Sequence, residues 1–365
     1  MTIIFAGGGT GGHLYPGLAI ARAMVRIDPQ TDPFFIGAQR GIEKDVLPGA
    51  GFEHELLDLH PLYRARPWEN WKTLRGAISA WRRIGERVKA YKPAAVVGTG
   101  GYASGLTLAY AAVKKIPFAI QEQNTFPGLT TRFFSRYASQ IHLGFPEARA
   151  HLKPSARTKV FNSGNPIEPP PADARDKRAG RAAWEFPPDR GTVLLVYGGS
   201  QGSQAMNEAV AGWVRSGTPD DLFIIWATGR GNHEQYSALE SERVKVRPYL
   251  SPVSDAYRAA DLALSRAGAM ATAELCAWGL PMILVPLPTA AADHQTANAR
   301  ALEAAGAAQV ILQSAMSPAA LSAAVSSLLS DPPRLAALSA YALERARPLA
   351  AEHIAQAILE LADVK

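Results

Sequence analysis

Short apolar runs alternate along the chain with segments long enough for a helix, and this alternation restricts the fold more than any other feature of the sequence. The runs that we expect to be strands are 2–6, 34–37, 52–57, 94–98, 117–121, 139–143, 192–197, 222–227, 244–248, 261–265, 281–286 and 307–312. The segments that we expect to be crossover helices include 16–28, where Pro16 suits the opening position, 70–91, 203–215, 270–278 and 295–305. Such alternation predicts an α/β fold, in which parallel sheets carry helices on both faces.

The alternation stops once, between Gly164 and Gly180, where four prolines and charges of both signs give the composition of a linker. After it, residues 192–202 repeat the beginning of the chain, with an apolar run, a glycine turn and a helix start. A chain of 365 residues is also too long for one ordinary hydrophobic core. We therefore expect two Rossmann-like domains that face a central cleft, at 1–163 and 164–344, and a last helix at about 345–365 that packs back onto the first domain.

The composition excludes several classes of protein. The single cysteine, Cys276, rules out an internal disulfide and a cysteine-rich metal site. No run of about 18 apolar residues is present to span a bilayer, and the apolar start at Ile3 is too short for a signal peptide. We expect a cytoplasmic protein that holds neither metal nor cofactor.

The net charge of +6 is unevenly placed. Between His60 and Lys92 there are nine Lys and Arg against two Glu, an excess of +7, and aromatic residues that include Trp68, Trp71 and Trp81 lie among them. Two interpretations stay open: a solvated helix whose aromatic stripe packs on a core, or a surface that lies on anionic lipid. No recognised motif supports nucleic-acid binding.

Three of the expected strand-to-helix turns are rich in glycine, at 7–12, 98–105 and 198–202. Glycine is favoured where the backbone needs a positive φ or where a ligand approaches closely, and a helix start offers unpaired N–H groups to an anion. A single turn of this kind can reflect packing alone. Three in one chain favour phosphate or diphosphate ligands.

The first turn also contains the spacing G-x-G-x-x-G, at Gly7, Gly9 and Gly12, which is typical of dinucleotide sites. Such a site needs an acidic residue at the end of the second strand, and residues 34–40 hold none. Arg40 could meet a 2′-phosphate, so an NADP-dependent oxidoreductase stays open as an alternative. No Gly-Lys-Ser/Thr follows any of the turns, which excludes a P-loop.

The second half holds two further stretches that are suited to a ligand. After the expected strand 261–265, small residues open a helix that carries Glu274, which would either bridge two ribose hydroxyls or form an ordinary ion pair. The polar cluster 293–298 would either cap a helix or bind sugar hydroxyls.

Several motifs then follow one another in a fixed order. They are GGTGGH at 8–13 with PG at 16–17, GGYxSG at 100–105, EQN at 122–124, GNP at 164–166, GGSQG at 198–202, SRxGA at 265–269, Glu274 and HQxxNA at 294–299. The set covers nearly the whole chain and resembles the MurG family, the peripheral membrane glycosyltransferases of peptidoglycan synthesis.

The resemblance implies a GT-B fold and an inverting transfer of N-acetylglucosamine from its UDP donor. The acceptor would be the 4-hydroxyl of undecaprenyl-diphosphate-linked N-acetylmuramyl pentapeptide (lipid I), which gives lipid II. Neither a metal nor a cofactor is implied. The implied partners are these two substrates, the anionic inner face of the cytoplasmic membrane and other cell-wall synthesis enzymes. A related enzyme with a diglyceride acceptor stays open as an alternative.

The resemblance also assigns site residues. The catalytic ones would be His13 and Glu122, and the acceptor side of the cleft would be lined by Thr10, Gly11, Gly12, Tyr102 and Asn124. The donor would meet Ser200, the Leu250 backbone, Arg266, Ala269, Met270, Glu274, His294 and Gln295. An inverting transfer needs one base, and at a helix start the charged form of His13 is disfavoured, which suits a proton acceptor. His13 as a simple hydrogen-bond partner of the helix start is the alternative.

Two positions depart from the family. Glu168 stands where an arginine can follow Asn-Pro-x, and Ala271 stands where a threonine lies near the donor phosphates. We expect Thr272 to replace that threonine in part.

Overall fold

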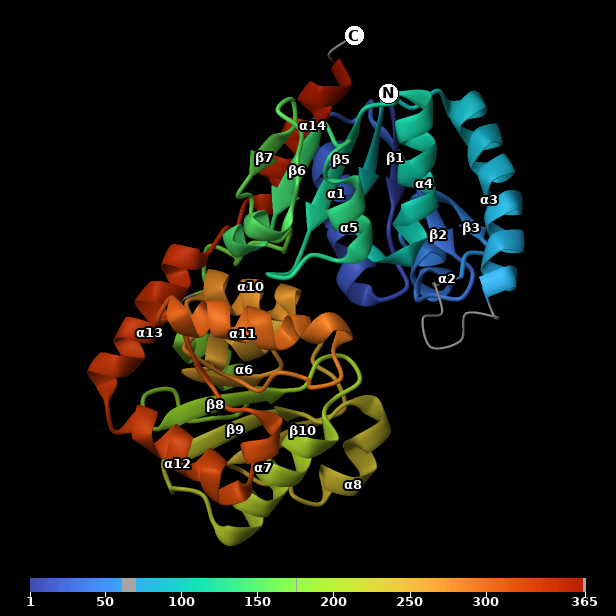
Figure 1. Cartoon of the computed structure of the whole chain (residues 1–365). Coiled ribbons are helices and arrows are strands. Elements are labelled where there is room, and N and C mark those ends of the chain that lie inside the picture. The colour runs from blue at the N-terminus through green and yellow to red at the C-terminus, as the bar shows by residue number, and fades with distance from the viewer. Residues whose placement is uncertain (61–69, 175, 364–365) are drawn as a thin grey trace. The chain divides into compact units, whose positions relative to one another are not determined.

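The computed structural model describes the backbone of residues 1–60, 70–174 and 176–363, and the side chains of these ranges except 70–75. The chain forms two compact units (Figure 1). Unit 1 comprises Met1–Glu168 and Arg347–Lys365, and unit 2 comprises Pro169–Ala346.

Unit 1 is built on a seven-stranded parallel sheet with the order β3-β2-β1-β4-β5-β6-β7. Its strands are β1 Thr2–Ala6, β2 Asp32–Ala38, β3 Glu53–Leu57, β4 Ala95–Gly98, β5 Phe118–Glu122, β6 Gln140–Leu143 and β7 Lys159–Phe161. The chain runs outward from β1 to β3, returns to β4 beside β1, and then runs outward the other way. The direction therefore reverses between β1 and β4, which is where ligands bind in sheets of this kind.

Helices cover both faces of this sheet. They are α1 Gly11–Ile27, α2 Glu43–Val46, α3 Asn70–Tyr91, α4 Gly101–Lys114, α5 Leu129–Phe134 and α14 Ala350–Asp363. Side chains alternate between the faces of a strand, so Ile3 and Phe5 pack against α1 and α14, whereas Ile4 joins the core under α3, α4 and α5.

Unit 2 repeats the plan with six parallel strands in the order β10-β9-β8-β11-β12-β13. The strands are β8 Thr192–Tyr197, β9 Leu222–Ala227, β10 Val244–Arg247, β11 Leu262–Ser265, β12 Met282–Leu284 and β13 Ala308–Val310. The helices are α6 Lys177–Ala183, α7 Gln204–Ser216, α8 His233–Ser237, α9 Val253–Ala259, α10 Ala269–Trp278, α11 His294–Ala304, α12 Pro318–Leu329 and α13 Pro332–Arg345. Here the direction reverses between β8 and β11.

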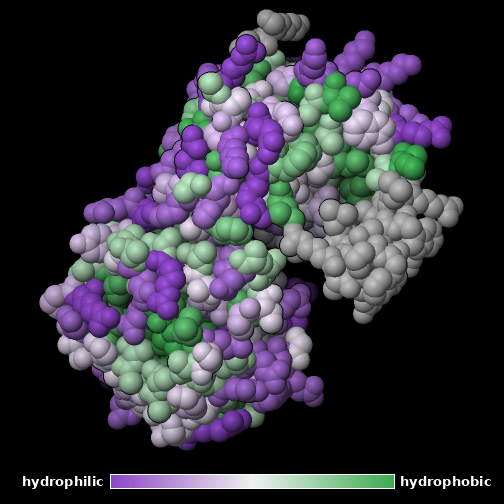
Figure 2. Space-filling model, viewed as in Figure 1, coloured by the Kyte–Doolittle hydropathy of each residue, from purple (hydrophilic) through white to green (hydrophobic). Residues whose placement is uncertain are grey.

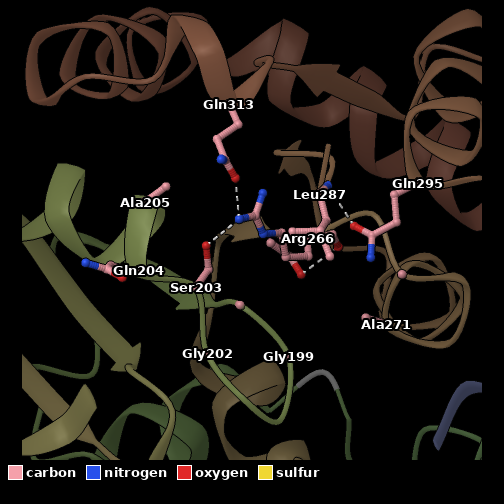
Figure 3. Close-up of a pocket in the computed structure, with 13 residues that line it drawn as sticks. Gly199, Gly202, Ser203, Gln204, Ala205, Arg266, Ala271, Leu287, Gln295 and Gln313 are labelled. Carbon is pink, nitrogen blue, oxygen red and sulfur yellow. Dashed lines mark hydrogen bonds between the residues drawn. The ribbon is translucent and has the colours of Figure 1, made fainter. Parts of the chain in front are cut away.

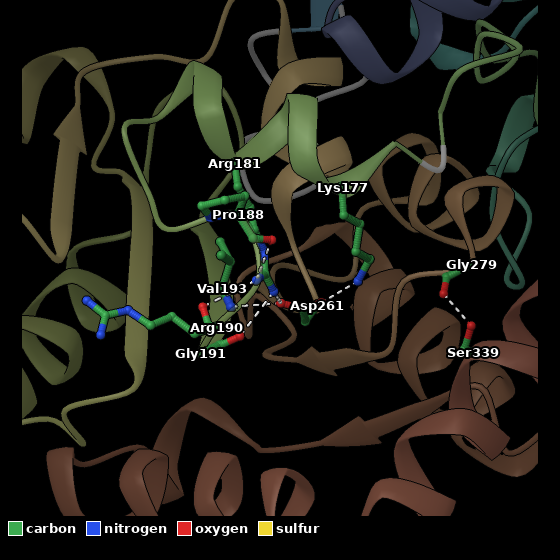
Figure 4. A network of polar contacts seen from close by, with 9 residues as sticks. All are labelled: Lys177, Arg181, Pro188, Arg190, Gly191, Val193, Asp261, Gly279 and Ser339. Carbon is green, nitrogen blue, oxygen red and sulfur yellow. Dashed lines mark hydrogen bonds and ion pairs between the residues drawn. The ribbon is translucent and has the colours of Figure 1, made fainter.

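A polar network ties the segment before β8 to the sheet of unit 2 (Figure 4). Asp261 lies just before β11 and accepts from Arg181 Nη2 at 2.8 Å and from Val193 N at 2.9 Å, and it also pairs with Lys177. Arg181 in turn donates to the carbonyl of Gly191 at 3.1 Å. These contacts lie at the amino ends of the strands, away from the glycine turn that follows β8, so their role is structural.

Each expected strand occurs, and β7 at the edge of the first sheet was missed because Lys159–Phe161 is short. The expected place of Pro16 was wrong. Helix α1 begins at Gly11, so Pro16 lies inside the helix, where its missing N–H leaves the carbonyl of Gly12 without the usual i to i+4 bond. His13 therefore lies in the first helical turn and not in the loop before it.

Candidate functional site

A pocket of about 370 Å³ lies in unit 2 at the carboxyl ends of β8 and β11 (Figure 3). Its lining residues come from the two turns after these strands and from the later segments of the unit: Gly198, Gly199, Gly202, Ser203, Gln204, Ala205, Ser265, Arg266, Gly268, Ala271, Leu287, Gln295 and Gln313. The pocket therefore lies where the strand order reverses, as expected for a ligand site.

Arg266 is the central charged residue of this pocket, and its side chain is buried. The guanidinium donates to the carbonyls of Val285 and Pro286 at 3.1 and 3.0 Å. It also donates to Ser203 Oγ and to Gln313 Oε1, both at 2.6 Å. Burial lowers the pKa of Arg266. All four partners are neutral, and among the described residues Arg266 forms no ion pair, so the pocket holds a cation without its counter-ion.

Two helix starts add to this positive potential. Helix α7 begins next to Ser203, whose hydroxyl caps it by accepting from Met206 N, and helix α10 begins after Gly268 without a side-chain cap. The N–H groups of a helix start that lack an internal partner attract anions. A buried cation beside two helix starts is suited to a diphosphate.

The structure brings only some of the expected donor residues into this pocket. Arg266 and Gln295 line it, together with Ala271, which was not an expected contact, and Gln295 Oε1 accepts from Leu287 N at 3.0 Å. Ala269 and Met270 lie in the first turn of α10, beside Ala271. The remaining four, Glu274 among them, occupy other places. Ser200 is exposed in the turn after β8, His294 donates through Nδ1 to the carbonyl of Ala291 at 2.7 Å, and Leu250 lines a separate cavity of about 330 Å³ with Trp184 and Tyr249.

Glu274 lies farther along α10, and its Oε2 accepts from the Tyr257 hydroxyl at 2.7 Å. Burial is the main cause that raises the pKa of Tyr257 well above the usual value, so the hydroxyl stays protonated and keeps donating. Tyr257 therefore holds the carboxylate of Glu274 in a fixed direction.

The expectation for Thr272 was wrong. Its hydroxyl is buried and faces the carbonyls of Gly268 and Ala269 at 3.0 and 3.1 Å, within its own helix. It cannot replace a threonine at position 271, where Ala271 borders the pocket.

The corresponding reversal point of unit 1 brings the turn after β1 together with the turn after β4. Thr99 Oγ1 donates to the carbonyl of His13 at 2.7 Å, and the ring of Tyr102 lies over Gly9. Gly101 has a φ of +74°, and a Cβ on it would overlap the carbonyl of Gly8. Glycine at position 101 thus allows the two turns to interlock.

A carboxylate fills the glycine turn of unit 1. Glu43 is fully buried, and its Oε1 accepts from the backbone N–H of Gly9 and of Ala38, both at 3.0 Å. A Cβ on Gly8 would overlap this carboxylate. The N–H of Gly9 is therefore already bound, so an anion at this turn would have to use the start of α1, where Thr10, Gly11 and Gly12 lie.

His13 is half-buried between these turns, and its Nδ1 lies 3.0 Å from Gln123 Oε1. Among the described residues no hydrogen bond reaches Nε2. This free nitrogen at the start of α1 can take a proton from a bound hydroxyl.

Glu122, expected to be catalytic, has a different environment. It is buried at the end of β5, where Oε1 accepts from Asn124 N at 3.1 Å and Oε2 accepts from Gly128 N at 3.2 Å. A carboxylate whose two oxygens each accept from a backbone N–H holds a loop in place. It fixes the segment that carries Asn124.

Sequence reasoning missed three residues of these sites, Glu43, Gln123 and Gln313. Each is far in the sequence from its partner, and only for Gln123 was there a signal, because it lies inside the EQN motif. In the described part of the chain, no group of His, Cys, Asp and Glu is arranged to hold a metal ion.

Residues 3–143 match the glycosyltransferase family 28 N-terminal domain, and residues 193–354 match the glycosyltransferase family 28 C-terminal domain. The chain is 41% identical to the UDP-N-acetylglucosamine–N-acetylmuramyl-(pentapeptide) pyrophosphoryl-undecaprenol N-acetylglucosamine transferase of Salinibacter ruber, over 99% of this chain and 97% of that protein. It is 37% identical to the protein of the same name from Moorella thermoacetica, over 99% of each. The crystal structure of MurG from Acinetobacter baumannii matches with a TM-score of 0.77 at 29% identity, over 98% of this chain and 99% of that one.

The chain belongs to the MurG family of glycosyltransferases. Its fold is the GT-B fold of that family, and these similarities support neither the diglyceride acceptor nor the NADP-dependent oxidoreductase. A glycosyltransferase of kitacinnamycin, at 16% identity and a TM-score of 0.71, shares the fold alone. In this chain, the pocket at Arg266 lies in unit 2 and the turn at His13 lies in unit 1 of the GT-B fold.

Proposed function

We propose that this chain transfers N-acetylglucosamine from UDP-N-acetylglucosamine to the 4-hydroxyl of lipid I, with inversion at the anomeric carbon. Family membership supports the two substrates. The assignment of donor binding to unit 2 rests on the buried Arg266. Its hydrogen-bond partners among the described residues are neutral, and it lies beside two helix starts. This arrangement binds the diphosphate of the donor in unit 2.

The donor would be held at three points. The diphosphate lies against Arg266 and the starts of α7 and α10, the ribose meets Glu274, and the sugar meets Gln295 and His294. The Tyr257 hydroxyl donates to Glu274 Oε2 at 2.7 Å and so holds the carboxylate that would meet the ribose. The leaving UDP is stabilised by the same cation and helix starts that bind it, without a metal ion.

The acceptor would be activated by unit 1. His13 Nε2 takes the proton of the acceptor 4-hydroxyl, the oxygen bonds to the anomeric carbon, and the bond from that carbon to the β-phosphate oxygen breaks with its electron pair on UDP. The diphosphate of lipid I would lie at the start of α1, on Thr10, Gly11 and Gly12. Tyr102 and Asn124 would line the acceptor beside it.

Transfer of labelled N-acetylglucosamine to a lipid I analogue tests this function directly. We expect lipid II analogue and UDP in equal amounts, and UDP-N-acetylglucosamine, but not NADPH, should raise the melting temperature. Glu274→Ala should weaken donor binding about tenfold, since a hydrogen bond to a charged group contributes about 1.5 kcal/mol. Glu234→Ala, at an exposed site of the same unit, is the control. Absence of transfer with both substrates present would refute the proposal.

We also propose that unit 1 lies on the anionic inner face of the membrane through α3, α4 and α5. Exposed apolar side chains on these helices and just after them are Ile78, Val113, Leu129, Phe133 and Tyr137. Figure 2 shows hydrophobic residues among hydrophilic ones over this part of unit 1. Exposed cations accompany them, including Lys114, Lys115 and Arg136. No helix in the described ranges could cross a membrane.

Part of the basic stretch 60–92 makes contacts with other residues of unit 1. Arg83 and Arg87 pair with Glu55, and Trp81 packs on Tyr110 with ring centroids 4.9 Å apart. The expectation of a core-facing aromatic therefore holds for Trp81. Tyr63, Trp68 and Trp71 lie outside the residues whose side chains are described.

Vesicle sedimentation tests the membrane surface. Reversing Arg82, Lys89, Lys114 and Lys115 to Glu should release the chain from vesicles that contain anionic lipid, because each surface cation contributes about 1 kcal/mol near such a membrane. Reversing Arg215 and Arg230 in unit 2 is the control. Unchanged binding of the first variant would exclude this face. Held at the membrane, the chain would meet other cell-wall synthesis enzymes, which we propose as partners.

A further inference from the structure

Gln123 lies just after β5, and its buried side chain touches His13 across 110 residues of sequence. Its amide nitrogen donates to the carbonyl of Thr99 at 2.8 Å and to the carbonyl of Gln121 at 3.2 Å. Backbone carbonyls only accept hydrogen bonds, so the group that faces them must be the NH₂. The Oε1 of Gln123 therefore faces His13, and the opposite orientation of the amide would place oxygen against oxygen.

A second series of hydrogen bonds between amide side chains supports the same orientation of Gln123. Asn165 Nδ2 donates to the carbonyl of Gln123 at 3.0 Å, which again only accepts. Asn165 Oδ1 then receives Gln121 Nε2 at 3.1 Å, and this leaves Gln121 Oε1 to face Gln123 Nε2. All three side chains are at most 2% exposed, so water does not reorient them.

The orientation of Gln123 decides the protonation of His13. Oε1 can only accept, so Nδ1 at 3.0 Å must carry the proton. A neutral imidazole has a single N–H, so its lone pair is on Nε2. Gly100 and Gly101 lie close to the ring, where a Cβ would come within 3.1 Å of Nδ1 and within 3.0 Å of Cδ2.

Two carboxylates of the surrounding elements are bound by backbone N–H groups and not by the ring. Glu43 is bound under Gly9, and the carboxylate of Glu122 is bound by the N–H groups of Asn124 and Gly128. The partner of Nδ1 is therefore a neutral amide. An amide selects the tautomer without the strong attraction that a carboxylate exerts on imidazolium.

We propose that Gln123 is a positioning residue that holds His13 in the Nδ1–H tautomer and so leaves Nε2 as the proton acceptor. The inference rests on the proposed role of His13 as the base. The network that orients Gln123 includes Gln121 and Asn165, which extends the supporting shell to the GNP motif. If the contact were packing alone, an isosteric apolar residue would replace Gln123 without consequence.

The test uses the full chain with ¹⁵N-labelled histidine and long-range ¹H–¹⁵N correlation, with His13 assigned from a His13→Gln sample. The wild type should show a protonated Nδ1 and a free Nε2. Gln123→Met should shift His13 toward the Nε2–H form and lower kcat by tenfold or more, with the KM for UDP-N-acetylglucosamine unchanged. Gln140→Met is the matched control, because Gln140 Oε1 contacts His142 Nε2 at 3.2 Å in the same sheet. It should leave both the His13 signals and kcat unaltered.

The outcomes separate this inference from the proposed function. A protonated Nε2 in the wild type, or a Gln123→Met variant that keeps both tautomer and kcat, overturns the inference. A fall in kcat with the tautomer unchanged also overturns it and leaves His13 as the base. A changed tautomer with full kcat instead refutes His13 as the base.

A second variant covers the case in which Gln123→Met does not fold, which a loss of the His142 signals would reveal. Gln123→Glu keeps an oxygen toward Nδ1 and adds a charge. The acidic limb of the kcat profile should then move up by about one pH unit, because an adjacent carboxylate favours imidazolium. An unmoved limb overturns the inference.

Discussion

Two of the three glycine turns, those after β1 and β8, occupy equivalent places in their sheets and hold opposite charges. In unit 1, the turn after β1 is filled by the buried carboxylate of Glu43, and Nδ1 of His13 beside it contacts the neutral amide of Gln123. In unit 2, the turn after β8 borders an open pocket with the buried cation of Arg266. In the proposed function, the topology therefore fixes where a ligand binds, and the side chains that enter from outside the turn determine whether the site takes up a proton or binds an anion.

Removing the base should give the largest effect. His13→Ala should lower kcat by about 10²–10⁴-fold, the usual contribution of a positioned general base. Donor binding should be unchanged because it belongs to unit 2. Transfer assays and calorimetry with UDP-N-acetylglucosamine measure the two quantities separately. Full activity of this variant would place the base elsewhere.

Removing the cation of Arg266 should affect UDP binding in unit 2. Arg266→Met should weaken UDP binding about 30-fold, since charge-assisted bonds contribute about 2 kcal/mol. Arg215→Met, at an exposed position of unit 2, is the control, and calorimetry with UDP gives the affinity. Equal affinity in both variants would mean that the diphosphate does not lie against Arg266.

A methyl group added to the turn after β1, which Glu43 fills, should destabilise the fold more than one added to the open turn after β8. Gly8→Ala must displace Glu43 and should lower the free energy of unfolding by about 2–3 kcal/mol, through overpacking. Gly199→Ala meets nothing within 4 Å and should cost only about 1 kcal/mol, because of its φ of +85°. Urea unfolding measures both. Combining Gly8→Ala with Glu43→Ala should relieve the clash, and strictly additive losses would argue against it.

The smallest expected effect is a gain. Ala271→Thr adds a hydroxyl at the start of α10, where Ala271 lines the pocket beside Arg266. It should tighten UDP binding about threefold, as expected for a neutral hydrogen bond of about 0.7 kcal/mol. Ala273→Thr, two positions along α10, is the control. Weaker binding of the first variant would show that the pocket has no room there.

The glycine turns and every described strand except β7 could be predicted from the sequence, because apolar runs and turn glycines are local properties of the chain. It did not predict what enters each turn from a distance. Glu43 lies 34 residues from Gly9, and Gln313 lies 47 residues from Arg266. The absence of an acid in 34–40 argued against a dinucleotide, yet an acid three residues beyond Arg40 folds back into the turn.

Glu122 and Thr272 show that the sequence also could not predict which polar side chains bind the backbone instead of a ligand. Both have side chains that suit a ligand, and both direct their oxygens at neighbouring backbone groups. Residue type and spacing could not reveal this, because the choice between ligand and backbone depends on side-chain direction within a single turn.

Helix α14 belongs to the core of unit 1 but is synthesised after unit 2. Ile354, Ala355 and Ile358 of this helix complete the core on which Ile3 and Phe5 pack. All seven strands of the first sheet leave the ribosome before α14 does, and the whole of unit 2 is made in between. The first half to be translated is therefore the last to be finished, and a fragment that ends at Glu168 would expose an apolar sheet face to aggregation.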